Sequence, residues 1–83
     1  IRFRNLALAY EALHQGGNMP CIVNAANEIV NLAFREGRCS FLGMGEVIEK
    51  TMQRATFDAK PDYEVYLQTD AEARRLATEL LTE

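Results

Sequence analysis

The chain has 83 residues, of which 48% are hydrophobic and 25% charged, and its formal net charge is −3. This balance is typical of a globular domain with one core and excludes an intrinsically disordered chain. The few basic residues are scattered, whereas a nucleic-acid binder needs clustered positive charge. No run approaches the roughly 20 apolar residues of a membrane span. We therefore expect neither nucleic acid nor a membrane as a partner.

The cysteines and the start of the chain bear on its cellular setting. Two cysteines without a basic leader and an apolar run favour a reducing, cytoplasmic location. The chain opens with Ile1 rather than Met and enters a helical pattern almost at once. We therefore expect residues 1–83 to be one domain, excised from a larger protein.

The first predicted element is an amphipathic helix that ends at Gly16 and Gly17. Glycine accepts the left-handed conformation that a helix C-terminus often requires. Four apolar residues of this helix are spaced at i, i+3, i+4 and i+7, which predicts a stripe that faces the core. The stripe consists of Leu6, Ala9, Tyr10 and Leu13.

The second predicted helix starts near Pro20, a residue suited to the first helical turn, and ends at Gly37. Its apolar residues cover about half of the circumference at 100° per residue, so we expect it to lie centrally. Truncating Phe34 or placing Asn at Ile29 is predicted to cost about 2–5 kcal/mol, as in a core. The apolar residues are Ile22, Val23, Ala25, Ala26, Ile29, Val30, Leu32, Ala33 and Phe34.

A third helix is predicted after a short link through Ser40 and Phe41. Its apolar residues at helical spacing are Met44, Val47, Ile48 and Met52. Pro61 then forbids a continuous helix. Residues 63–67 favour a strand, but an isolated strand has no partner, so we expect a helical turn or an extended segment.

A fourth helix is predicted to begin at Thr69, which has capping-box spacing to Glu72, or to be capped by Asp70. Its core-facing residues are Ala73, Leu76, Ala77 and Leu80, and Arg75 and Glu79 form an exposed pair. The four helices together predict an all-α fold, a small four-helix bundle-like domain with short connections.

No residue pattern for metal binding or nucleophilic catalysis is complete. The candidates are His14, Cys21 and Cys39, but the cysteines lie far apart, whereas zinc ligands come in closely spaced pairs. Cys21 near a helix N-terminus would still need a base, and His14 is the sole histidine. We interpret both cysteines as small core side chains and His14 as a favourable charge at a helix C-terminus.

Two glycine-rich segments are candidates for a phosphate site. Residues 16–18 precede a helix N-terminus, where an anion can bind, but no lysine follows and no strand precedes. The segment 43–45 is a weaker candidate. Both glycine pairs are better interpreted as helix punctuation.

A line of polar side chains is the most distinctive feature of the second helix. Asn24, Glu28, Asn31 and Arg35 are spaced at i, i+4, i+7 and i+11, opposite the apolar arc. A solvated face is the ordinary interpretation. Asparagine is a poor helix former in a helix interior, which favours a domain-docking face held by side-chain hydrogen bonds. Both interpretations stay open, and neither is catalytic.

These runs of residues resemble the C-terminal domain of the 1-deoxy-D-xylulose 5-phosphate reductoisomerases. The most specific run is Pro-Cys-Ile-Val-Asn-Ala-Ala-Asn-Glu at residues 20–28. The resemblance covers nearly the whole chain. Family members often have aspartate where Gly43 stands, which implies that the usual cap of the third helix is missing. The other matching runs are residues 6–13, 16–17, 33–37, 41–42 and 69–74.

The resemblance implies a non-catalytic structural domain of an enzyme of non-mevalonate isoprenoid biosynthesis. That parent enzyme isomerises 1-deoxy-D-xylulose 5-phosphate and reduces the product with NADPH to 2-C-methyl-D-erythritol 4-phosphate. It uses magnesium or manganese and is a homodimer. The family's NADPH-binding and catalytic domains lie elsewhere in the chain, and the catalytic domain is the expected partner of this one. No catalytic, cofactor or metal residue is carried over to this sequence, which is expected to be inactive alone.

An independent helical protein-interaction module is the alternative interpretation. Such a module would act through an apolar groove that a partner fills. An NADPH-binding domain encoded upstream of Ile1 would favour the enzyme domain over the module.

Overall fold

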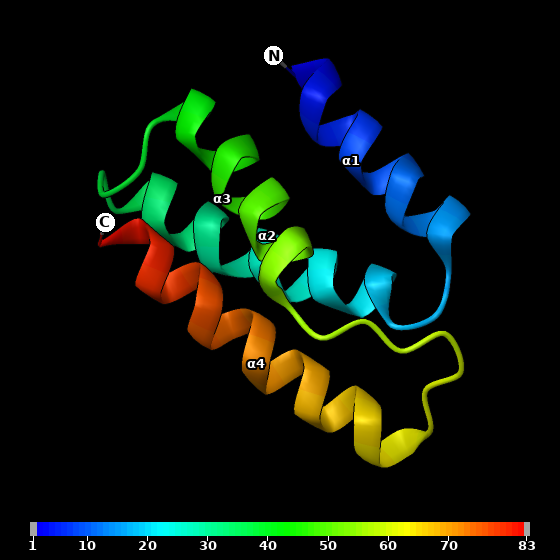
Figure 1. The fold of residues 1–83 in the computed structure, drawn as a ribbon. Helices are drawn as coiled ribbons and strands as arrows, with labels where there is room; N and C mark the ends of the chain where they lie inside the picture. The colour runs from blue at the N-terminus through cyan, green and yellow to red at the C-terminus, as the bar shows by residue number, and fades with distance from the viewer. Residues whose placement is uncertain (1, 83) are drawn as a thin grey trace.

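The computed structural model describes residues 2–82, with side chains from residue 6 onward, and this part of the chain forms four α-helices (Figure 1). No strand occurs within it. The predicted all-α, four-helix architecture is confirmed. The helices are α1 Arg2–Gln15, α2 Met19–Arg35, α3 Phe41–Arg54 and α4 Tyr63–Leu81.

Helix α2 is the centre of the bundle, as its wide apolar arc predicted. It contacts each of the other helices, whereas α1 reaches α2 and α3 but, within the described residues, not α4. Figure 1 shows α1 and α4 on opposite sides, with α2 passing behind α3. The buried residues of α2 are Met19, Ile22, Ala25, Ala26, Val30 and Ala33.

The C-terminus of α2 is closed by the glycine that the sequence indicated. Gly37 has a φ of +76°, and its N–H donates to the Phe34 carbonyl oxygen at 3.1 Å. The N–H of Arg38 donates to the Ala33 carbonyl oxygen at 2.8 Å. These two bonds satisfy carbonyl groups that the last turn of a helix leaves without partners.

Phe34 does not belong to the core, so the expected core role of this residue is wrong. Its side chain is 43% exposed and meets Phe41 edge-on, with 6.0 Å between the ring centroids. Leu32 is exposed as well, and Ile29 is half-buried against the core. The apolar arc of α2 is wider than the surface that the other three helices cover.

We expect Ile22→Ala to lower the free energy of unfolding of the 83-residue chain by about 3 kcal/mol, because Ile22 is fully buried. Phe34→Ala should cost only about 1 kcal/mol, because much of the ring already lies in water. Urea unfolding followed by circular dichroism measures both. Equal losses for the two variants would contradict this description of the core.

The predicted inward face of α1 is also wrong. Leu8 and Ala12 are buried against the bundle, whereas Leu6, Tyr10 and Leu13 are 53%, 64% and 68% exposed. Helix α1 is apolar over two adjoining faces, and α2 and α3 cover only one of them. Its residue spacing predicted a helix correctly but could not decide between the two faces.

Helix α3 buries the four side chains that its spacing predicted: Met44, Val47, Ile48 and Met52. Although Gly43 stands where the resembled family often has aspartate, Ser40 caps this helix. Its Oγ accepts a hydrogen bond from the Gly43 N–H at 2.9 Å, which satisfies a free donor of the first turn. Gly43 and Gly45 lie inside this helix, so the punctuation interpretation is wrong for that pair.

Helix α4 begins earlier than predicted. Asp62 caps it by accepting the Val65 N–H at 2.9 Å, and residues 63–67 form its first turns. Thr69 and Asp70 therefore lie within the helix, and the expectation that they cap it is wrong. Further along, α4 buries Ala73, Ala77 and Leu80 as predicted, and Leu76 is half-buried against the core. The exposed Arg75–Glu79 pair is confirmed at 3.0 Å.

Candidate functional site

The predicted polar line lies along one side of α2 and forms hydrogen bonds within that helix. Asn24 Nδ2 donates to Glu28 Oε2 at 3.3 Å. Asn31 Nδ2 donates to the carbonyl oxygen of Asn27 at 2.8 Å and to its Oδ1 at 2.9 Å. Arg35 Nε donates to the Asn31 carbonyl oxygen at 3.4 Å. These bonds orient amide and guanidinium groups on a face where Asn24, Glu28 and Arg35 are exposed.

Glu28 also joins α2 to α4 through Arg74, a contact that sequence reasoning missed. Arg74 Nη2 lies 2.9 Å from Glu28 Oε1, and its Nε lies 2.9 Å from Asp70 Oδ2. The hydrogen bonds to Asp70 and then to Glu28 raise the pKa of Arg74 above its usual value. Because the three side chains are partly in water, each pair contributes about 1 kcal/mol or less. A pair across two helices leaves no signal in the spacing of one helix.

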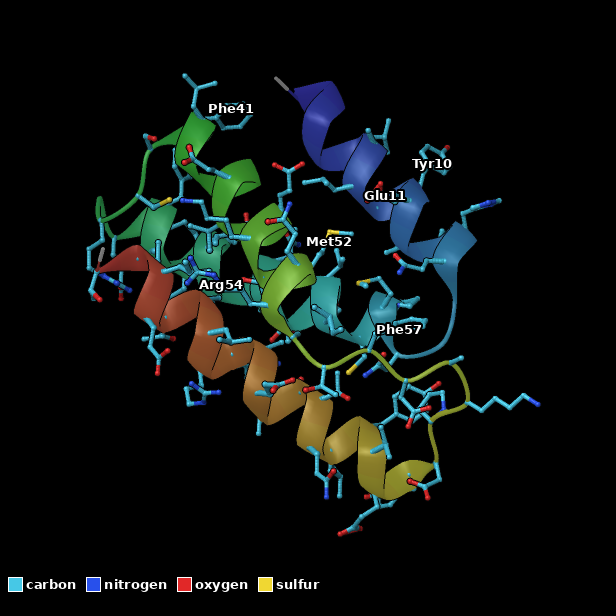
Figure 2. The ribbon with its side chains drawn as sticks, viewed as in Figure 1. Tyr10, Glu11, Phe41, Met52, Arg54 and Phe57 are labelled. Carbon is cyan, nitrogen blue, oxygen red and sulfur yellow. The ribbon has the colours of Figure 1, made fainter. Side chains whose placement is uncertain are left out.

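A hollow of about 510 Å³ lies between α1 and α2, next to the polar line. Asn24 belongs to both surfaces, so the apolar hollow continues directly into the polar line. In Figure 2, Tyr10 lies on the side of α1 turned away from α3 and α4. The apolar spacing of Leu6, Tyr10 and Leu13 is the sequence signal for this surface, but the spacing predicted that this stripe faces the core. The lining residues are Leu6, Ala9, Ala12, Leu13, Pro20, Val23, Asn24, Asn27 and Ile48.

Residues 16–18, the candidate anion site, instead bind the connection between α3 and α4. Asn18 is 1% exposed, and its Nδ2 donates to the Thr56 carbonyl oxygen at 2.9 Å and to Thr69 Oγ1 at 2.8 Å. Its Oδ1 accepts from the Asp58 N–H at 2.8 Å. The punctuation interpretation is confirmed for this glycine pair, since α1 ends at Gln15 and both glycines have positive φ.

The two cysteines are half-buried, and neither belongs to α1, the helix that carries the sole histidine, His14. Cys21 Sγ is 3.8 Å from the Tyr66 carbonyl oxygen, and Cys39 lies before α3. Burial raises the pKa of both thiols; for Cys21 the Asp70 carboxylate adds to this effect and Arg74 opposes it. A raised pKa means less thiolate at neutral pH than in a free cysteine, which disfavours a nucleophilic role.

Within residues 2–82, no group of three or more His, Cys, Asp and Glu side chains is arranged to hold a metal ion. Nor is any helix of this described part both long and apolar enough to cross a membrane. The polar line and the hollow beside it are the candidate functional surfaces.

Comparison with known proteins gives a family match over most of the chain. A family model described as "DXP reductoisomerase C-terminal domain" matches residues 1–76. A curated relative from Bacteroides thetaiotaomicron is 69% identical over 80 residues, which are 96% of this chain and 20% of the relative. No solved structure matches the chain.

More distant relatives extend the same pattern. A protein from Geobacillus sp. (strain WCH70) is 46% identical over 80 residues, which are 96% of this chain and 21% of that protein. One from Bacillus cereus (strain AH187) is 45% identical over 78 residues, 94% of this chain and 20% of that protein. Each of these relatives is named 1-deoxy-D-xylulose 5-phosphate reductoisomerase. The chain spans about one fifth of the length of the curated relatives that it matches.

Proposed function

The chain belongs to the DXP reductoisomerase C-terminal domain family, and on this premise we propose that it is the non-catalytic structural domain of a parent reductoisomerase. The parent isomerises 1-deoxy-D-xylulose 5-phosphate and reduces the product with NADPH to 2-C-methyl-D-erythritol 4-phosphate, in non-mevalonate isoprenoid biosynthesis. The observation that carries the proposal is the match of residues 1–76 to a C-terminal domain. The relatives named for this activity are about five times longer, which leaves ample chain for the chemistry.

The residues that the structure describes do not fit the cofactors of that reaction. A dinucleotide site commonly needs a glycine-rich turn between a strand and a helix, and the described residues are helical or irregular. Divalent cations prefer several converging carboxylate oxygens. Here Glu28 and Asp70 pair with Arg74, Glu79 pairs with Arg75, and Asp62 caps α4. We place NADPH and magnesium or manganese in other parts of the parent and derive no step through them.

The proposed partner is the catalytic domain of the same parent chain, in a homodimeric, cytoplasmic enzyme. The polar line of Asn24, Glu28, Asn31 and Arg35 is the candidate docking face. Hydrogen bonds along α2 support this proposal, because they already orient these side chains. Side chains that are oriented in advance lose less conformational entropy when a second surface binds them.

The function is tested by comparing the 83-residue chain with the full-length parent. The parent should oxidise NADPH in the presence of 1-deoxy-D-xylulose 5-phosphate and a divalent metal, as followed by NADPH absorbance. The 83-residue chain should unfold cooperatively in urea yet show no turnover. Turnover by the pure 83-residue chain would contradict the non-catalytic role. A parent protein without this activity would contradict the assigned reaction.

The docking role of the polar line is tested by a matched pair of variants in the parent enzyme. Glu28→Ala and Arg74→Ala both remove the 2.9 Å ion pair between these two side chains, and Arg74→Ala removes the Asp70 pair as well, but only Glu28 belongs to the line. Loss of an interface hydrogen bond of about 1 kcal/mol should lower kcat/KM about fivefold more in Glu28→Ala than in Arg74→Ala. Asn24→Ala should act in the same direction. Equal effects of Glu28→Ala and Arg74→Ala would mean that Glu28 acts only within the bundle.

A further inference from the structure

The start of α2 is bonded to α4 and to the connection before it, and none of these bonds involves α1. The Asn18 N–H donates to the Asp58 carbonyl oxygen at 2.9 Å. The Asn18 amide bonds Thr56 and Thr69 as well. Gly17 approaches Asp58 so closely that a Cβ on it would overlap the Asp58 carbonyl oxygen. Helices α2, α3 and α4 also contact one another in every pairing, so residues 17–82 form one three-helix body.

Helix α1 is attached to this three-helix body by little buried surface. Between residues 6 and 15, the part of α1 whose side chains are described, Leu8 and Ala12 are the buried ones. No side chain of that stretch forms a hydrogen bond or an ion pair with another helix. Figure 1 shows α1 on the outside of the bundle, on the side opposite α4. By contrast, α2 buries six side chains, so α1 is the helix that is least tightly held.

Gly16 provides a hinge between α1 and the three-helix body. Gly16 and Gly17 both have positive φ, but their surroundings differ. No atom lies within 4 Å of a Cβ placed on Gly16, whereas Gly17 is packed against the backbone of Asp58. Glycine has the widest range of backbone conformations, so a rotation at Gly16 meets little resistance. Such a rotation turns α1 and leaves Gly17 and the bonds of Asn18 in place.

We propose that α1 opens as a unit, turning about Gly16, while the three-helix body stays folded. Proteins open in cooperative parts of this kind, and the parts with few buried apolar contacts open most readily. The body that remains is comparable in length to the smallest domains that fold alone, roughly 55–65 residues. Ala12 of α1 and Ile48 of α3 both line the hollow beside α1, so the hollow exists in the closed form and is taken apart in the open one. This motion does not depend on the proposed function, because every contact involved lies within this chain.

A matched pair of leucine truncations tests this motion in the 83-residue chain. Leu8 on α1 and Leu80 on α4 are each 7% exposed. Native-state hydrogen exchange at low urea concentrations, read by NMR, measures the opening of each helix separately. Leu80→Ala should speed exchange in α2, α3 and α4 at least about tenfold and leave exchange in α1 unchanged, because the Leu80 contacts persist when α1 opens. Leu8→Ala should speed exchange in all four helices, because both openings break the Leu8 contacts.

The unsubstituted chain provides a second measurement. The amides of residues 8–15 should share one opening constant, at least about tenfold larger than that of the centre of α2. Its urea dependence should be shallower, because opening α1 exposes less surface than complete unfolding does. Equal acceleration of all four helices by Leu80→Ala, or one urea dependence shared by all of them, would overturn the proposal.

Two other results would also overturn it. Exchange that is independent of urea and differs from one amide of α1 to the next would indicate fraying from the helix end rather than opening as a unit. A chain without protected amides in α2, α3 and α4 would show that the three-helix body does not stay folded.

Discussion

Gly17→Ala is expected to destabilise the domain by about 3 kcal/mol or more, the sum of backbone strain and a steric overlap. Gly17 has a φ of +56°, which costs a residue with a Cβ about 1–2 kcal/mol. A Cβ at this position would also overlap the carbonyl oxygen of Asp58 and lie 2.9 Å from the Ala59 Cα. Backbone atoms cannot rotate away as a side chain can, so the connection between α3 and α4 would have to move.

Gly16→Ala is the matched control for this prediction. Gly16 has a φ of +72°, but no atom lies within 4 Å of the position of its Cβ. Gly16→Ala should therefore lower the free energy of unfolding by about 1 kcal/mol, which is the backbone strain alone. Urea unfolding of the 83-residue chain measures both variants. Similar losses for Gly16→Ala and Gly17→Ala would show that the close approach to Asp58 is absent in solution.

Asn18→Ala is expected to cost about 3 kcal/mol, because it leaves three polar groups without their partner. These are the Thr56 carbonyl, the Thr69 hydroxyl and the Asp58 N–H, which all bond the Asn18 amide at 2.8–2.9 Å. Domains of this size have about 4–12 kcal/mol of total stability, so the loss is a large fraction of the whole. The Asn18 side chain forms no capping bond to α2, so the effect is not the loss of a helix cap.

Asn31→Ala serves as the control. The Asn31 amide nitrogen donates to Asn27, one turn earlier in the same helix, and so joins no distant parts of the chain. It should change the free energy of unfolding by about 0.5 kcal/mol or less, as an ordinary surface substitution does. The comparison is made by urea unfolding of the 83-residue chain. An Asn18→Ala variant as stable as Asn31→Ala would refute the buried role of Asn18.

The sequence was sufficient for the number of helices, the central place of α2 and the buried face of α3. Each of these depends on local information: a 3.6-residue period, a glycine or proline at a helix end, and the width of an apolar arc. The start of α4 depends on a distant contact. Asp62 and Thr69 are both suitable N-caps, and Thr69 is instead bonded to Asn18, 51 residues away.

The candidate site shows the same division between local and distant information. The polar line was visible from spacing on α2, but the partner of Glu28 is Arg74 on another helix. The stripe of Leu6, Tyr10 and Leu13 was recognised, yet its exposure depends on which side of α1 the other helices cover. A helix with two apolar faces satisfies the pattern in either orientation, so periodicity alone cannot choose between them.

The bonds of Asn18 also bear on the order in which the bundle assembles. They join residues 38 to 51 positions apart, whereas each helix and its caps involve neighbours only. Closing such long loops costs entropy that is recovered only after the intervening helices have packed. We therefore expect the turn between α1 and α2 to bond to α4 and to the connection before it late in folding. A contact formed after the transition state slows unfolding rather than speeding folding, so we expect the bonds of Asn18 to lower the unfolding rate of the bundle.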